Sequence, residues 1–248
     1  EKSMPGKTVV WQEEWQAQEL LGLELRATLL RGRSRIARKS EYFTCSRSVQ
    51  HVLMWGRGNH GGMQFPGVTR FMDGIVEGAN IYNEQNSADV KVLGWDAQKQ
   101  TGTFVGGDNP WGDPAKGEQL AQTFMDQGAD IVHPVAGATG NGTIKAMAAA
   151  GKWAIGVDSD QSLTLPEYAK AILTSAEKRI DVAVLETIKK NAGGDMGGEN
   201  FVGTIANGGV GISPLHDFES QVSPELLAAV DKLQQDIASG AININDYK

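Results

Sequence analysis

The clearest hydrophobic pattern in the chain begins at residue 68. Apolar residues recur there at positions i, i+3, i+4, i+7, i+8 and i+11, namely Val68, Phe71, Met72, Ile75, Val76 and Ala79. This spacing places them on one face of a helix, which is predicted to end near Asn80. The same reasoning predicts helices over residues 11–30, 114–127 and 176–191. A last helix over residues 224–239 has Ser223 as its N-cap and Gly240 as its stop.

Short apolar runs between these helices predict strands. They lie at residues 51–55, 90–95, 131–135, 153–157 and 171–175. Strands and helices therefore alternate from residue 51 to residue 157. This order is typical of an α/β fold with a mostly parallel sheet and right-handed crossovers.

The most informative stretch is residues 128–161, which is typical of a βαβ unit. A strand is followed by a glycine-rich turn at residues 136–142, a helix at 143–150, a second strand and an acidic turn at 158–161. Ligands of open α/β sheets bind beyond the carboxyl ends of the strands. We therefore expect the two turns to lie side by side at one edge of the sheet and to form a binding site.

The acidic turn supplies the main candidate chemistry. The carboxylates of Asp158 and Asp160 are suited to accept hydrogen bonds from vicinal hydroxyls. Two other interpretations stay open: the two acids cap the turn through bonds to the backbone, or they are the acid and base of a hydrolase. Lys178 either balances these acids or extends from the start of a helix. Trp95 and Trp111 are either stacking surfaces for a ligand or parts of the core.

Composition narrows the class of protein. The net charge of -7 over 248 residues argues against nonspecific binding to nucleic acid. The single cysteine, Cys45, excludes an intramolecular disulfide. No apolar run approaches the ~18 to 20 residues that a membrane span needs. The basic run at residues 31–39 is interpreted as a solvated face or a connector. The alternative is a segment that binds an anionic surface. The first residues lack the pattern of a signal peptide, so the chain is expected to be a mature or shortened product, or one never exported.

The motifs of common enzymes are absent from the sequence. It contains no GxxxxGK[ST] loop, CxxC pair, HExxH helix or GxSxG elbow, and its four histidines are scattered. The glycines of residues 137–142 are spaced wrongly for a GxGxxG dinucleotide fingerprint. We therefore predict a protein that is not an enzyme and that has no cofactor and no metal site.

Several short segments in order resemble the basic membrane protein family, the substrate-binding lipoproteins of ABC importers. The resemblance runs from about residue 61 to about residue 240, and the segments that carry it are GGM (61–63), WGDPAKG (111–117), GADIV (128–132), AGATG (136–140), IGVDSDQ (155–161), TS (174–175) with Lys178 and Asp181, and GVGI (209–212). It implies a type I periplasmic-binding fold, in which two α/β lobes joined by a hinge enclose the ligand. It also implies a purine nucleoside as ligand and a membrane permease as partner.

The resemblance extends to individual positions and to cellular context. It implies ligand contacts at Trp111, Gly137, Asp158, Asp160, Lys178 and Asp181. It also implies an extracytoplasmic protein that is anchored by lipid in its full-length precursor and acts as a monomer. The alternative hypothesis is a cytoplasmic ligand-sensing regulator of the same fold.

The resemblance also predicts how the chain is divided. Residues 61–160 and 200–220 would form one lobe, and residues 161–199 and 221–248 would supply the hinge and crossing segments of the second. Residues 1–60 do not match the beginning of the family, which supplies a strand, an acidic-glycine turn and ligand contacts there. The first lobe is therefore expected to be incomplete.

Overall fold

The computed structural model describes residues 10–11, 56–194 and 201–248. The predicted strand at 51–55 and the basic run at 31–39 lie outside these ranges, as does nearly all of the predicted helix at 11–30. Trp11, the first residue of that predicted helix, belongs to a strand instead. Its backbone pairs in parallel with a segment near residue 202.

Six of the strands in these ranges form one sheet in the order β10-β8-β7-β6-β2-β3. All neighbours are parallel except β10, which runs antiparallel to β8. Two further pairs, β1 with β9 and β4 with β5, stand apart from it. The strands are β1 (Val10–Trp11), β2 (Gly56–Gly61), β3 (Lys91–Leu93), β4 (Trp95–Asp96), β5 (Thr101–Gly102), β6 (Ala129–Val135), β7 (Trp153–Asp158), β8 (Ile172–Lys178), β9 (Val202–Gly203) and β10 (Val210–Ile212).

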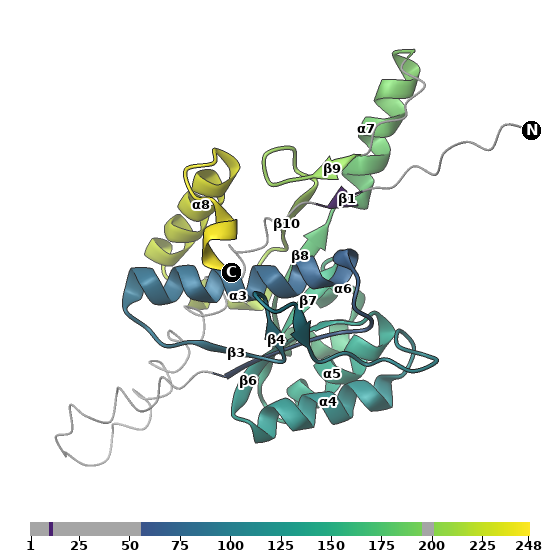
Figure 1. Ribbon diagram of the computed structural model, residues 1–248, viewed down its shortest axis with the longest axis vertical. Helices are drawn as coiled ribbons and strands as arrows, with labels where there is room; N and C mark the ends of the chain where they lie inside the picture. Colours follow the sequence, from purple (N-terminus) through teal and green to yellow (C-terminus); the bar gives the residue numbers. More distant parts are fainter. Residues whose placement is uncertain (1–9, 12–55, 195–200) are drawn as a thin grey trace, which may run out of the picture.

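Helices cover both faces of this sheet (Figure 1). The α-helices are α3 (Pro66–Asn86), α4 (Pro114–Asp126), α5 (Ala138–Ala149), α6 (Gln161–Thr164), α7 (Ile180–Ala192) and α8 (Pro224–Ala238). Three short 3-10 helices are η1 (Pro166–Ala171), η2 (His216–Gln221) and η3 (Ile244–Tyr247). The predicted alternation of strand and helix, and a parallel sheet, are confirmed.

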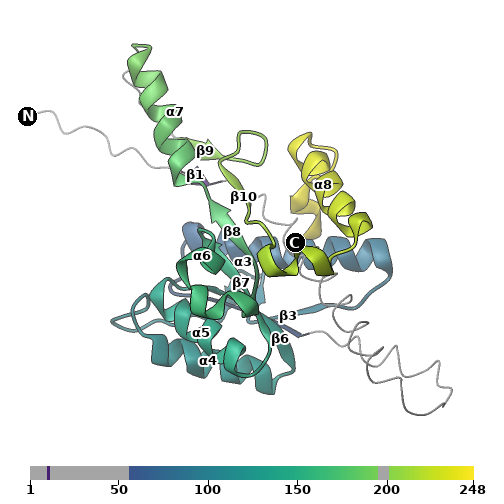
Figure 2. The same cartoon turned by 180° about the vertical axis from the view of Figure 1, so that it is seen from behind.

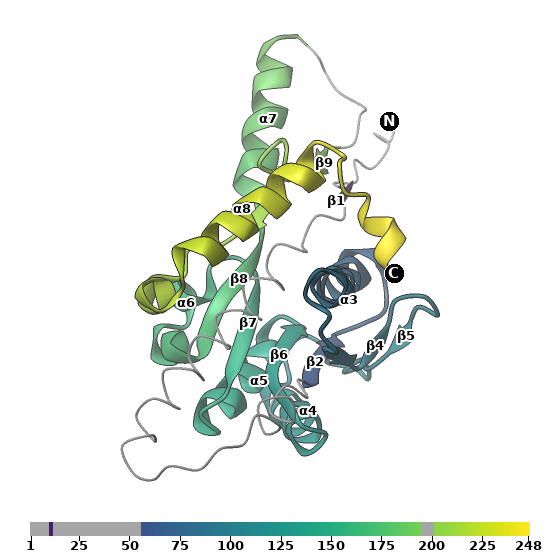
Figure 3. The same ribbon diagram turned by 90° about the vertical axis from the view of Figure 1, so that its left-hand side faces the viewer.

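The core is divided by the sheet into two layers. Ile131, Ile155 and Leu173 face one side, where they pack with α3 and α8. Val132 faces the other side and packs against α4 and α5. Neighbouring strand residues are buried on opposite faces, which is typical of parallel sheets covered on both sides. Figure 3 shows these layers edge-on, with α4 and α5 on one side of the strands and α3 on the other.

Strand β2 lies inside the sheet although its sequence, GRGNHG, has no aliphatic residue. Arg57, Asn59 and His60 are nevertheless buried there. Asn59 donates from Nδ2 to the carbonyl of Met72 at 3.1 Å. Tertiary contacts of this kind are not visible in a hydrophobic pattern, so sequence analysis placed a strand only at residues 51–55 and ended it before Gly56.

The predicted glycine-rich turn at residues 136–142 is too long, because α5 already begins at Ala138. Residues 139–142 are helical, and their glycines serve helix packing. A Cβ atom on Gly142 would lie 1.9 Å from the carbonyl oxygen of Pro114 in α4. Gly142 therefore allows α4 and α5 to approach closely, and Gly137, which precedes the helix, has a positive φ of 54°.

The predicted helix at 176–191 begins four residues too early. Ala176, Glu177 and Lys178 continue β8, because all three pair with β10 and the first two also pair with β7. Helix α7 begins at Ile180 and projects from the body of the molecule (Figures 1 and 2). Lys178 is therefore at the end of a strand and not at the start of a helix.

Two smaller predictions change in detail. The predicted strand at 90–95 is divided at Gly94, which has a φ of 84°. The long connection that follows contains the β4–β5 hairpin. The last helix is confirmed, with the Ser223 side chain accepting a hydrogen bond from the Leu226 amide at 3.2 Å.

Candidate functional site

The carboxyl ends of four parallel strands meet at one edge of the sheet. Gly61 at the end of β2 pairs with Val135 at the end of β6, and Asp158 at the end of β7 pairs with Glu177 next to the end of β8. The Gly62 amide donates to the Val135 carbonyl at 2.9 Å, which extends this edge into the next loop. We call this edge, with the loops that follow the four strands, the strand-end surface.

Asp158 and Lys178 form the charged part of the strand-end surface. Lys178 Nζ lies 2.5 Å from Asp158 Oδ1 and 5.6 Å from the centre of the Phe71 ring. The Asp158 side chain is 50% exposed. Its backbone has a φ of 66°, a conformation that is uncommon for residues with a side chain and that recurs at binding sites. This carboxylate is therefore available to a polar ligand.

Asp160 is placed differently from Asp158, because its carboxylate turns into the protein. Oδ1 accepts a hydrogen bond from the Ser162 amide at 3.0 Å, which caps α6. Oδ2 lies 2.6 Å from Nε2 of His216. The side chain is only 11% exposed. The turn-capping role considered for this residue is present, and both oxygens have protein partners.

Aromatic side chains occupy the other part of the strand-end surface. Trp111 is exposed and contacts Phe65 edge to face, with ring centres 6.0 Å apart. The carbonyl of Trp111 accepts from the Thr139 amide at 3.2 Å, so its loop is fixed to the start of α5. Trp95, the other candidate for stacking, is buried and donates from Nε1 to Asp73 Oδ1 at 2.8 Å. Trp95 is therefore part of the core.

Gly137 lies beside Trp111 at the N-terminus of α5. A Cβ atom on Gly137 would lie 3.4 Å from the Trp111 carbonyl oxygen. Its positive φ favours glycine, because a side chain would be strained there. The absence of a side chain at Gly137 therefore lets the Trp111 loop lie close to the backbone at the start of α5.

Asp181 lies in the first turn of α7, beyond the end of β8. Its oxygens accept from Nε and Nη2 of Arg179 at 3.0 and 2.8 Å. The hydrogen bond from this guanidinium lowers the pKa of the Asp181 carboxyl. The pair is exposed, so Asp181 stays ionised and open to solvent.

Sequence reasoning missed three features of this region. Phe65 and Met63 are both exposed, and Phe65 contacts Trp111, while His216 reaches Asp160 from 56 residues away. Glu177 also lies near the acids, and burial raises its pKa, with Asp160 and Asp181 acting in the same direction and Arg179 opposing. Phe65 and Met63 adjoin the Gly61-Gly62 turn and could have been noted, whereas no local signal links His216 to residue 160.

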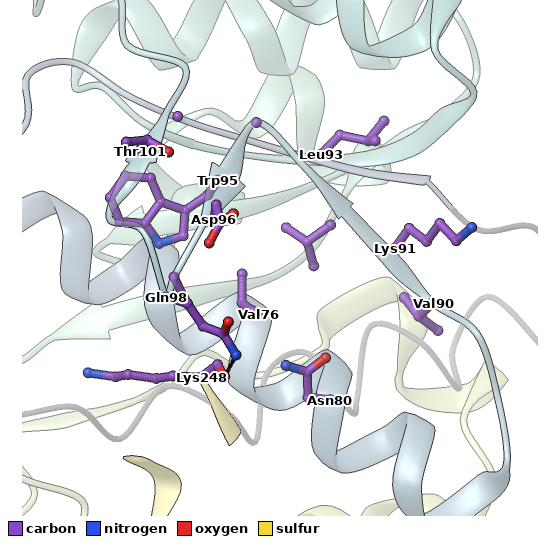
Figure 4. Close-up of a pocket in the computed structure, with 14 residues that line it drawn as sticks. Val76, Asn80, Val90, Lys91, Leu93, Trp95, Asp96, Gln98, Thr101 and Lys248 are labelled. Atoms are coloured by element: carbon purple, nitrogen blue, oxygen red, sulfur yellow. Dashed lines mark hydrogen bonds between the residues drawn. The ribbon is translucent and has the colours of Figure 1, made fainter. Parts of the chain in front are cut away.

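The two hollows described in the structure lie away from this surface. One, of about 670 Å³, is lined by β3, the β4–β5 hairpin, α3 and Lys248 (Figure 4). Gln98 donates to the Lys248 carbonyl across it at 2.9 Å. The other lies between the end of α3 and the start of α8.

Among residues 10–11, 56–194 and 201–248, no group of three His, Cys, Asp or Glu side chains is arranged to hold a metal ion. No helix among them has the length and apolar character needed to cross a membrane.

The fold defines a class of protein. The solute-binding protein of an ABC transporter system from Aeropyrum pernix superposes with a TM-score of 0.68 at 22% identity, covering 97% of this chain and 68% of its own. The molecule therefore has the α/β fold of solute-binding proteins, with a mostly parallel sheet between helices.

The sequence comparison identifies the family. The profile of the Bmp family, described as ABC transporter substrate-binding protein PnrA-like, matches residues 53–248, so the chain belongs to this family. The ABC transporter nucleoside-binding protein BmpA of Lactococcus lactis is 28% identical over 200 residues, which are 74% of this chain and 51% of BmpA. An uncharacterised lipoprotein of Pyrococcus abyssi is 32% identical over 156 residues, 60% of this chain and 35% of that protein. The chain thus spans about half the length of BmpA and about a third of the length of the Pyrococcus lipoprotein.

Proposed function

We propose that this chain is the solute-binding component of an ABC importer and binds a purine nucleoside without chemistry. The observation that carries the proposal is the Asp158–Lys178 ion pair, which lies at the carboxyl ends of two neighbouring parallel strands. The Asp158 side chain of this pair is 50% exposed. Membership of the Bmp family and the nucleoside-binding name of its Lactococcus relative support it.

The arrangement of side chains suits the two parts of a nucleoside. The Asp158 carboxylate would accept hydrogen bonds from the ribose hydroxyls, while its ion pair with Lys178 would hold it in orientation. Trp111 would stack on the base, since its ring is exposed and its loop is fixed. Gly137 would let the ligand approach the backbone. Asp160 would hold the ligand-binding turn in place, and Asp181 would face the ligand from the first turn of α7.

A ligand bound at the strand-end surface would be enclosed by a second surface of the molecule. We propose that the six-stranded sheet and its helices are one lobe, and that α7 with the β1–β9 pair belongs to the other. Closure of two lobes on a ligand is a known mode of recognition that requires no covalent step. The partner would be a membrane permease, and the setting would be outside the cytoplasm on a lipid anchor, in keeping with the lipoprotein name of the Pyrococcus relative.

A thermal-shift series on the purified chain tests the proposal. Inosine, guanosine and adenosine are compared with pyrimidine nucleosides, ribose and free bases. A ligand at ~100 times its Kd adds about 2.7 kcal/mol of stability, so a purine nucleoside should raise the melting temperature measurably. Asp158→Asn should abolish this shift. The control is Asp96→Asn, which removes an exposed acid paired with Lys99 at 2.7 Å in the β4–β5 hairpin and should leave the shift unchanged. A cooperative melt with no response to any purine nucleoside would contradict the proposal.

A further inference from the structure

We propose that His216 is a positioning residue for the ligand-binding turn at residues 158–161 and that it acts through Asp160. The inference rests on the proposed function, because it concerns how tightly that turn holds a ligand. In this view Asp160 does not touch the nucleoside. It connects the turn to the segment at residues 213–216, which follows β10.

The geometry around Asp160 is the first support. Both carboxylate oxygens are occupied, one by the Ser162 amide at 3.0 Å and the other by His216 Nε2 at 2.6 Å. The Asp160 side chain is 11% exposed, whereas Asp158, two residues earlier, is 50% exposed. The two acids of the turn are therefore separated by function: one faces solvent, and the other holds the turn in place.

The backbone of His216 is the second support. It has a φ of 47°, in the left-handed region that residues with a side chain rarely adopt. Such conformations persist where the surrounding contacts fix them, and they cluster at functional sites. The side chain of the same residue bonds to Asp160, so this contact is one of those that fix the strained backbone of His216.

A second connection joins the same two segments in parallel. The Gln161 amide donates to Ser175 Oγ at 3.0 Å, and Gln161 Oε1 accepts from the Val157 amide at 2.9 Å. The Ser175 amide in turn donates to Ser213 Oγ at 2.8 Å. Residues 158–161 are thus held by His216 on one side and by Ser175 of β8 on the other, and Ser175 is itself bound to Ser213.

This bracing has a consequence for binding. A loop that is already ordered loses less conformational entropy when a ligand binds, so its affinity is higher. Removing the His216 contact should loosen the turn that presents Asp158 and weaken binding, although the imidazole touches no ligand.

The test is a double-mutant cycle on Asp160 and His216, read by isothermal titration with inosine. His216→Ala should weaken binding by about tenfold. Asp160→Ala, which also loses the cap on the Ser162 amide, should weaken binding at least as much. The double variant should be no weaker than Asp160→Ala, because the contact with His216 is already lost in that variant. His216→Gln, whose amide can donate to Asp160, should restore most of the affinity. If the two losses add in the double variant, His216 does not act through Asp160, which would overturn the inference.

Two controls separate positioning from general stability and from failure of the proposed function. Val230→Ala, a buried position on α8, should lower the melting temperature but leave the affinity unchanged. Hydrogen exchange of the amides at residues 159–162 is measured without ligand and should be faster in His216→Ala than in the wild type. If the wild type binds no nucleoside but exchange is faster in His216→Ala, the proposed function fails and the role of His216 in ordering the turn is supported. If exchange is the same in His216→Ala and the wild type, that role is refuted, whether or not the protein binds a nucleoside.

Discussion

Two histidines lie buried in neighbouring strands of the central sheet. His60 in β2 places Nε2 2.9 Å from Thr143 Oγ1 and stacks on Phe124. His133 in β6 packs near the Phe71 ring, and neither of its ring nitrogens has a hydrogen-bond partner among the described residues. Burial lowers the pKa of His60 to about 4 and that of His133 to about 3, the latter with a contribution from His60. Both side chains are therefore neutral in the folded protein at pH 7.

These histidines predict a loss of stability in mild acid. An unfolded histidine has a pKa of about 6.5, so below that pH the unfolded chain binds protons that the folded chain does not. Their contribution to stability is complete above pH 6.5 and is lost progressively as the pH falls toward 4. For His60 alone the loss is on the order of 3 kcal/mol at its limit.

Urea unfolding at pH 7, 6, 5 and 4.5 measures this effect. His133→Leu should reduce the slope of stability against pH over this range, since one buried titrating group is gone. It should also leave stability at pH 7 equal or higher, because unpaired buried nitrogens are removed. An unchanged slope in this variant would show that His133 is not kept neutral by the fold.

Helices α4 and α5 pack backbone against backbone through two glycines. A Cβ atom on Gly117 in α4 would lie 1.9 Å from the Thr139 carbonyl oxygen, and one on Gly142 in α5 would lie 1.9 Å from that of Pro114. The same contact brings Thr139 within reach of the site, where its hydroxyl accepts from the Asp113 amide at 2.9 Å. The close approach thus fixes the start of α5 and the Trp111 loop together.

Gly142→Ala should destabilise the protein, against the usual preference of helices. In a free helix this change gains up to about 1 kcal/mol, whereas here the methyl group meets a backbone carbonyl, and overpacking costs typically 1–3 kcal/mol. Thermal unfolding measures the sign. Gly211→Ala is the matched control, because a Cβ atom there meets nothing within 4 Å and should change stability little. A more stable Gly142→Ala variant would refute the close contact.

At the scale of the whole molecule, α7 stands apart from the body, as both opposite views show (Figures 1 and 2). Ala183 is the buried residue of this helix. Four large apolar side chains, Ile180, Val184, Leu185 and Ile188, are between 50% and 58% exposed. They lie along one face at helical spacing, as the sequence pattern indicated, but within the described residues they are not part of the core.

An exposed apolar face predicts binding of a hydrophobic dye. The double variant Val184→Lys, Ile188→Lys should reduce the fluorescence of 8-anilinonaphthalene-1-sulfonate and change stability by no more than about 0.5 kcal/mol. Thr187→Lys with Asn191→Lys adds the same charge to exposed positions of α7 without removing an apolar side chain, so it should leave the fluorescence unchanged or higher. A large drop in melting temperature for the first pair alone would mean that this face is covered in the folded protein.

Sequence patterns predicted helices and strands well where local periodicity and capping residues alone determine the structure. The period of residues 68–79 identified α3, and Ser223 with the apolar positions after it identified α8. Errors arose where neighbours compete with local preference. Ala176 to Lys178 are good helix formers, but pairing on both sides made them a strand. The polar β2 lies inside the sheet because β3 and β6 flank it on either side.

By itself the sequence determined the α/β class, the order of strands and helices, and the position of Asp158 at the end of a strand and of Trp111 in a loop. These follow from local periodicity and turn chemistry, which depend on residues close together in the chain. Its short motifs also resembled the family that the profile match then showed. The tertiary structure alone decided that Asp158 faces solvent beside Lys178 while Asp160 turns inward to His216. That choice depends on contacts between residues 20 and 56 positions apart, which are brought together only when β8 pairs with β7 and β10 pairs with β8.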